Sequence, residues 1–233
     1  MIGILVELLL SWLLLKYFAR ENLDALGLKP NGIRVLHLCA GILWPILFVA
    51  IYSYSVSLLV HNPYRVNPAF QWSHLRSWIG FLLRSVAYED LAFRGAVLYV
   101  LIRKIGPQKA LLISAAAFGI YHWFSYQVLG NPAQMLLVFV MTGMAGYIFA
   151  LAFERTLSMY LPFGLHFGID FAKMVLFPSE KHTGVALFFR TYSKDPVSPS
   201  AWISVVAILI YFLGFPTLTF LGLRRILRDQ TLR

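Results

Sequence analysis

The sequence has little charge and almost no cysteine. Asp, Glu, Lys and Arg make up 13% of the 233 residues, whereas soluble domains carry about 25%. Cys39 is the only cysteine, so the chain cannot form an intramolecular disulfide or a cysteine-clustered zinc or iron–sulfur site. With so little charge, intrinsic disorder, a coiled coil and a DNA-binding domain are excluded.

Apolar side chains dominate what is present. Hydrophobic residues account for 59% of the chain, and the mean hydropathy is +0.71. A membrane-spanning helix needs about 20 mostly apolar residues. The sequence contains seven apolar runs, at about 2–18, 34–60, 77–102, 110–129, 133–153, 158–177 and 200–222. We therefore expect an all-α polytopic membrane protein with about seven transmembrane helices, in which residues 1–233 form a single transmembrane domain.

The positive net charge of +10 follows membrane topology. Lys and Arg lie between the apolar runs and do not gather on one soluble face, so the predicted partner is the lipid bilayer and not nucleic acid. An N-terminus outside the membrane would leave most of them inside: Arg20, Lys29, Arg34, Arg103, Lys104, Lys109, Arg155, Arg224, Arg225, Arg228 and Arg233. The opposite side would hold Arg65, Arg76, Lys181, Arg190 and Lys194. The positive-inside rule thus favours a multi-pass protein with its N-terminus outside and its C-terminus inside. The expected location is a bacterial or archaeal cytoplasmic membrane.

Several ionisable side chains fall inside the apolar runs. A charged side chain at mid-bilayer costs about 2.5–3.5 kcal/mol on insertion scales, so each one needs a partner or a role. The polar or charged residues at such positions are Glu89, Asp90, Arg94, His122, His166 and Asp170. Taken one at a time, each could be a hydrogen-bonded residue of a helix bundle. Together they suggest a functional site.

Helical spacing divides the three ionisable residues of the third apolar run into an ion pair and an unpaired carboxylate. Asp90 and Arg94 are four residues apart with the acid first, the order that favours an ion pair within one helix. Glu89 lies about 100° around the helix from Asp90, so its carboxylate remains free to face another element. It is the candidate general base.

The same spacing recurs on two further runs. His122 follows Phe118 by four residues, and Asp170 follows His166 by four. Residues four apart share one face of a helix, so two imidazoles and two carboxylates can converge on one site.

Three segments also carry a family resemblance. They read Glu89-Asp90-Leu-Ala-Phe-Arg94-Gly95, Phe118-Gly-Ile-Tyr-His122 and His166-Phe-Gly-Ile-Asp170. In this order they resemble the EExxxR, FxxxH and HxxxN/D motifs of the CPBP intramembrane proteases, a family named for CAAX proteases and bacteriocin-processing enzymes. The resemblance covers about 77–177 and implies a four-helix catalytic core there.

The resemblance implies a glutamic-type intramembrane peptidase. Glu89, helped by His122, would activate the attacking water, and His166 and Asp170 would hold the carbonyl oxygen. The resemblance also implies three residues that hold the catalytic side chains in place without contacting the substrate: Asp90, Arg94 and Phe118. The chain departs from the commonest pattern at Asp90, where many relatives have Glu, and at Asp170, where many have Asn. Because Asp donates a hydrogen bond only when it is protonated, Asp170 could instead orient His166 and stabilise its imidazolium form.

Alternatives to this interpretation remain open at the level of sequence. A Glu, two His and an Asp have the ligand types of a catalytic zinc site, but no His-Glu-x-x-His motif is present and the resemblance implies catalysis without a cofactor. A non-catalytic membrane scaffold that binds a partner protein is the alternative function, and the retained motifs argue against it. A proton-coupled transporter would also bury such residues, but no inverted repeat is visible. The expected substrate is a membrane-associated or lipid-proximal protein or peptide; prenylated C-termini, peptide precursors and C-terminal sorting tags are all compatible with it.

Overall fold

The computed structural model describes residues 2–178, 186–190 and 199–226, and this part of the chain is almost entirely helical, as predicted. Its α-helices are α1 (Ile2–Leu14), α2 (Gly32–Leu59), α3 (Trp72–Arg94), α4 (Ala96–Ile105), α5 (Pro107–Ser125), α6 (Pro132–Thr156), α7 (Tyr160–Phe171), α8 (Ala201–Leu209) and α9 (Phe215–Ile226). Short π- or 3-10 turns extend or join them: η1 (Leu15–Ala19), η2 (Leu23–Leu26), η3 (Ala172–Leu176) and η4 (Ile210–Gly214). Lys181, Lys194, Arg228 and Arg233, used above for topology, lie outside the described residues.

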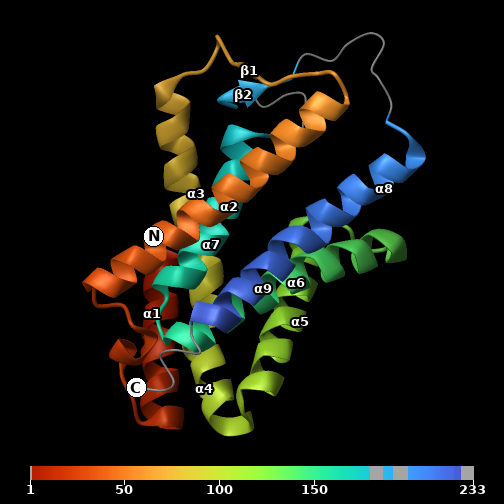
Figure 1. Cartoon of the computed structure of the whole chain (residues 1–233). Helices are drawn as coiled ribbons and strands as arrows, with labels where there is room; N and C mark the ends of the chain where they lie inside the picture. Colours follow the sequence, from red (N-terminus) through yellow and green to blue (C-terminus); the bar gives the residue numbers. More distant parts are fainter. Residues whose placement is uncertain (1, 179–185, 191–198, 227–233) are drawn as a thin grey trace.

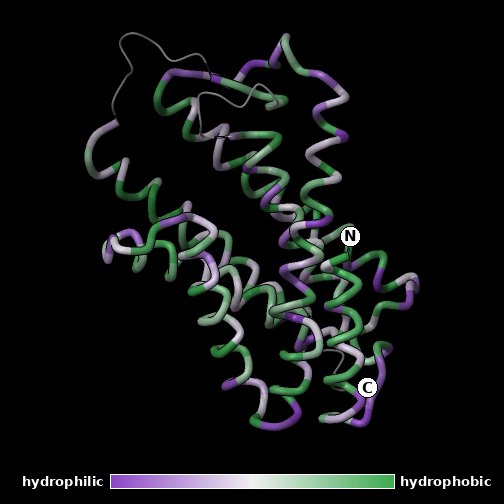
Figure 2. The backbone as a smooth tube through the Cα atoms, turned by 180° about the vertical axis from the view of Figure 1, so that it is seen from behind, coloured by the Kyte–Doolittle hydropathy of each residue, from purple (hydrophilic) through white to green (hydrophobic). Residues whose placement is uncertain are grey.

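Four helical segments of the described chain are long and apolar enough to cross a membrane. They are Ile2–Ala19, Gly32–Leu59, Pro132–Thr156 and Ala201–Arg225. Figure 2 shows hydrophobic residues along most of the helical tube and hydrophilic ones mainly in the connections. A polytopic helical membrane protein is therefore supported, whereas the count of about seven spans remains a prediction.

The third apolar run is not the single helix that we predicted. It forms two helices, α3 and α4, which are separated at Gly95. A Cβ at this position would collide with the backbone carbonyl of Leu91, so the chain turns where only glycine fits. The hydroxyl of Ser114 on α5 donates to the carbonyl oxygen of Phe93 at 2.8 Å. This hydrogen bond ties the end of α3, just before the break, to α5.

Glycine also allows α2 and α7 to cross at close range (Figure 1). A Cβ on Gly164 would lie 2.7 Å from the carbonyl oxygen of Leu38, and one on Gly41 would lie 2.9 Å from that of Leu161. Because real Cβ atoms do not approach so closely, the two backbones pack directly on each other. This crossing fixes the position of α7, which carries His166.

A small antiparallel ribbon lies at one end of the molecule. Strand β1 (Arg65–Val66) pairs with β2 (Phe188–Phe189), with Arg65 opposite Phe189. Figure 1 shows this ribbon at the end remote from the connection between α4 and α5. Arg65 on β1 therefore lies at the opposite end of the molecule from the α4–α5 connection, which Arg103 and Lys104 precede. The orientation of the chain in the membrane remains a prediction.

Candidate active site

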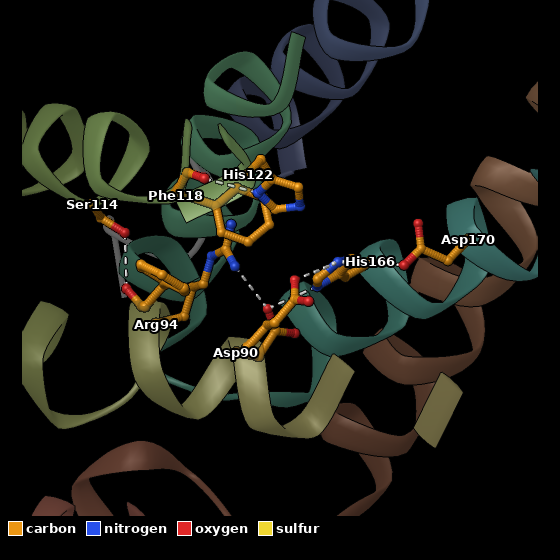
Figure 3. A network of polar contacts seen from close by, with 9 residues as sticks. Asp90, Arg94, Ser114, Phe118, His122, His166 and Asp170 are labelled. Carbon is orange, nitrogen blue, oxygen red and sulfur yellow. Dashed lines mark hydrogen bonds and ion pairs between the residues drawn. The ribbon is translucent and has the colours of Figure 1, made fainter. Parts of the chain in front are cut away.

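Helices α3, α5, α6 and α7 pack against one another around one polar cluster. Helix α3 carries Glu89, Asp90 and Arg94, while His122 comes from α5 and His166 from α7. Figure 3 shows the labelled side chains of these helices pointing toward one another. Asp90 and His166, which are 76 positions apart in sequence, thus meet at a single site.

Asp90 is the centre of this cluster. Its Oδ1 atom accepts a hydrogen bond from Arg94 Nη1 at 3.1 Å, which confirms the ion pair predicted from their spacing. The same oxygen lies 3.1 Å from Nδ1 of His166, a contact that the sequence did not predict. Both Asp90 and Arg94 are fully buried. Asp90 therefore links the cation on its own helix to the histidine of α7.

Aromatic rings enclose the guanidinium of Arg94. Its Cζ atom lies 3.8 Å from the ring centroid of Phe118 and 5.1 Å from that of Phe149. Arg94 Nε and Nη2 have no hydrogen-bond partner within the described chain. Cation–π attraction of this kind strengthens when water is excluded. The two rings therefore compensate in part for the acceptors that Nε and Nη2 lack.

His166 presents its second nitrogen to two carboxylates. Nε2 lies 3.7 Å from Oε2 of Glu89 and 3.5 Å from Oδ2 of Asp170. The imidazole stacks on Phe149 with 4.8 Å between centroids and 24° between planes. Because Asp90 accepts from Nδ1, Nε2 is the nitrogen that faces the space between Glu89 and Asp170. The side chain of Asp170 is 35% exposed, compared with 14% for Glu89, so this space opens on the side of Asp170.

His122 is oriented by its own helix. Its Nδ1 lies 2.8 Å from the carbonyl oxygen of Phe118, to which it can only donate. In the neutral ring this assigns the lone pair to Nε2. The ring of Phe118 packs 4.3 Å from the ring of His122 and 5.7 Å from that of His166. Phe118 therefore separates and positions the two histidines, as Figure 3 shows.

The contribution of α6 was missed at the level of sequence. Phe149 contacts both His166 and Arg94, but a phenylalanine in a chain with 19 of them gives no signal. A Cβ on Gly146 would lie 2.9 Å from the Phe118 ring and 3.3 Å from Arg94 Nη2. Gly146 thus provides the room in which Phe118 covers the guanidinium.

Gly146→Ala is accordingly expected to lower the free energy of unfolding by about 1–3 kcal/mol, the usual cost of overpacking a core. Gly143→Ala is the matched control, because its Cβ would meet only Ala115 O at an ordinary 3.5 Å, one turn earlier on α6. Denaturation of both variants in mixed detergent checks this. Equal stabilities would show that Gly146 does not set the space for Phe118.

The polar cluster does not have the arrangement of a metal centre. In residues 2–178, 186–190 and 199–226, no group of three or more His, Cys, Asp or Glu side chains is placed to hold a metal ion. Asp90, moreover, is already engaged by Arg94 and His166. The donor set of the described residues therefore gives the zinc alternative no support.

Comparison with family models gives a match over the part of the chain that carries the polar cluster. Residues 71–172 match the family model described as "Type II CAAX prenyl endopeptidase Rce1-like". This match contains all three motifs and confirms the resemblance to the CPBP and CAAX proteases. It supports intramembrane protease activity, and with the long apolar helices it indicates a multi-pass membrane protein. Searches of curated proteins and of solved structures found no match to the chain.

Proposed function

We propose that this protein is a glutamic-type intramembrane endopeptidase that hydrolyses a peptide bond of a membrane-associated or lipid-proximal protein or peptide. The observation that carries the proposal is the division of work between two adjacent carboxylates. Asp90 is buried and neutralised by Arg94, whereas Glu89 faces the partly open space beside His166. Glu89 is therefore the carboxylate available to a water molecule.

In the proposed reaction Glu89 accepts a proton from water, and the oxygen attacks the carbonyl carbon of the scissile bond. His122 assists through Nε2, because its Nδ1 is committed to the carbonyl of Phe118. When the tetrahedral intermediate collapses, the carbon–nitrogen bond breaks and the leaving amine takes the proton from Glu89. General acid–base groups of this kind typically contribute about 10²–10⁴-fold to the rate.

The charge that develops on the carbonyl oxygen needs donors on the other side of the site. His166, in its protonated form, can donate from Nε2, and Asp90 holds the ring in this orientation through Nδ1. Asp170 lies beside the same nitrogen and can either donate to the oxygen or stabilise the imidazolium.

We further propose that residues 1–233 form a single transmembrane domain with a catalytic core at 77–177. The N-terminus would be outside and the C-terminus inside a bacterial or archaeal cytoplasmic membrane. The separation of basic residues between the two ends of the molecule supports this orientation.

The test of the proposed function is a cleavage screen with the purified full-length chain. The protein in detergent is incubated with a library of hydrophobic peptides, and new termini are identified by mass spectrometry. Cleavage by the wild type that is lost in Glu89→Gln supports the proposal. A chain that cleaves no peptide, or cleaves equally well without Glu89, contradicts it.

Asp170→Asn distinguishes the two roles of Asp170. If Asp170 donates to the oxyanion, the amide donates at every pH, so activity is preserved or raised and an alkaline limb disappears from the pH–rate profile. If it stabilises imidazolium at His166, the amide supplies no negative charge and activity falls. We favour the donor role, because Asp170 follows His166 by four residues and lies beside its Nε2, so both side chains can reach one oxygen. A profile identical to that of the wild type would remove Asp170 from the chemistry.

A further inference from the structure

A groove between α2, α7 and α9 lies apart from the candidate active site. It has a volume of about 250 Å³, and none of the four candidate catalytic side chains lines it. Most of its walls are apolar and come from Ala40, Leu161, Leu165, Leu218, Gly222 and Leu223. The proposed peptide hydrolysis therefore does not use this groove.

Three side chains with polar atoms also line the groove: His37, Trp44 and Thr219. Trp44 Nε1 donates to Thr219 Oγ1 at 2.8 Å, and this hydroxyl donates to the carbonyl oxygen of Phe215 at 2.7 Å. Nδ1 of His37 is buried and has no hydrogen-bond partner within the described chain. His37 is thus the residue of the lining that can still bind a polar group of a ligand.

The bond between Trp44 and Thr219 also gives the relative direction of the two helices. From this bond the lining continues toward the start of α2, at His37, and toward the end of α9, at Leu223. The start of α2 therefore lies beside the end of α9. Both helices belong to segments long and apolar enough to cross a membrane, Gly32–Leu59 and Ala201–Arg225. This end of the groove is thus where the two segments reach the membrane surface.

Two arginines lie one helical turn beyond the lining at this end. Arg34 precedes His37 by three residues on α2, and Arg225 follows Gly222 by three on α9. Arg34 Nη1 donates to the carbonyl oxygen of Lys29 at 2.6 Å, which uses one of five guanidinium N–H donors. Arg225 is exposed. Among the described residues, no carboxylate lies within 4.0 Å of either guanidinium, so both can bind an anion.

An amphiphile with an anionic head and a hydrocarbon tail matches this combination. Basic pockets between transmembrane helices bind the headgroups of anionic lipids, whereas free phosphate would gain nothing from apolar walls. A zwitterionic lipid would bring its own cation close to the two arginines. His37 lies about 4.5 Å from Arg34 along the helix, at the depth of the ester oxygens beneath a phosphate. Its ring can donate to one of these oxygens.

We propose that this groove binds one anionic phospholipid of the surrounding bilayer. The phosphate lies between Arg34 and Arg225, and an acyl chain fills the groove against α7. The bound lipid links α2 to α9 next to the crossing of α2 and α7. This binding is separate from peptide hydrolysis and does not depend on the role of Glu89.

Native mass spectrometry of the full-length protein in detergent tests the headgroup. The protein is titrated separately with phosphatidylglycerol and phosphatidylcholine that carry the same palmitoyl and oleoyl chains, and the Kd of the first bound lipid is measured. We expect about 10- to 30-fold tighter binding of phosphatidylglycerol, the contribution of two cations near a membrane surface. Arg34→Gln/Arg225→Gln should make the two Kd values about equal. Arg225→Gln alone, which keeps the bond from Arg34 to Lys29, repeats the test if the double variant does not fold.

Arg103→Gln/Lys104→Gln is the matched control for charge. It removes two exposed cations from the last turn of α4, outside the groove, and should keep the preference for phosphatidylglycerol.

Gly222→Leu tests the acyl chain. A Cβ on Gly222 would meet nothing within 4 Å, so the leucine can enter the groove without a collision. It takes the place of at least two methylene groups of the lipid, and the Kd of phosphatidylglycerol should rise by about 10-fold. Gly80→Leu on α3 is the control, because its Cβ also meets nothing within 4 Å and Gly80 does not line the groove. The proposal is overturned if the two lipids bind the wild type equally, if the preference survives loss of the two arginines or disappears equally in the α4 control, or if both leucine variants bind like the wild type.

Discussion

Glu89→Gln is expected to reduce peptide hydrolysis by at least about 10³-fold while the protein stays folded. The amide preserves the shape of the side chain but cannot take a proton from water, and a general base supplies up to about 10⁴-fold. His166 Nε2 lies 3.7 Å from Glu89 Oε2, a distance beyond a strong hydrogen bond. Removal of the charge therefore costs little stability. Turnover at saturating substrate and a melting curve in detergent measure the two effects.

Glu7→Gln provides the matched control for this result. Glu7 is a partly buried carboxylate on α1, and its Oε2 has no hydrogen-bond partner in the described structure. The same chemical change is thus made in another apolar helix, away from the polar cluster. We expect normal turnover for Glu7→Gln. An equal loss in both variants would mean that buried carboxylates matter to the fold and not to the reaction.

Asp90→Ala is expected to lower the free energy of unfolding by about 3–5 kcal/mol, as for one partner removed from a buried ion pair. It leaves Arg94 without its acid and His166 Nδ1 without its acceptor. Arg94→Ala should cost less than Asp90→Ala, because Asp90 then retains its contact with His166. Denaturation in mixed detergent gives both values.

The double variant Asp90→Ala/Arg94→Ala completes the cycle. It should be less destabilised than the sum of the single variants, because no unpaired charge remains. Arg84→Ala is the control on the same helix, since Arg84 is exposed and surface changes usually stay within about 0.5 kcal/mol. Strictly additive effects would show that the two charges do not stabilise each other.

The helices were predictable because apolar length is a direct requirement of the bilayer. Most apolar runs correspond to helices, with ends displaced by a few residues. The break at Gly95 was not predicted, because a glycine in an apolar run is compatible with a continuous membrane helix and the collision with Leu91 exists only in three dimensions. The β1–β2 ribbon was missed for a similar reason, since four residues in two distant loops leave no periodic pattern.

The candidate site was predictable where polarity contrasts with an apolar background. Buried ionisable residues at i and i+4 identified Asp90 with Arg94 and His166 with Asp170. The contact between Asp90 and His166 joins different helices, and sequence spacing carries no information on such pairs. Phe149 and Gly146 were missed because apolar and small residues are ordinary in membrane helices.

The most direct test of the central claim is single-turnover cleavage of a peptide from the screen in ¹⁸O-labelled water. We predict that the wild type incorporates one ¹⁸O atom into the newly formed carboxyl group, and that Glu89→Gln forms no labelled product on the same timescale. Labelled product from Glu89→Gln at a rate near that of the wild type would show that another group activates the water, and would contradict the account.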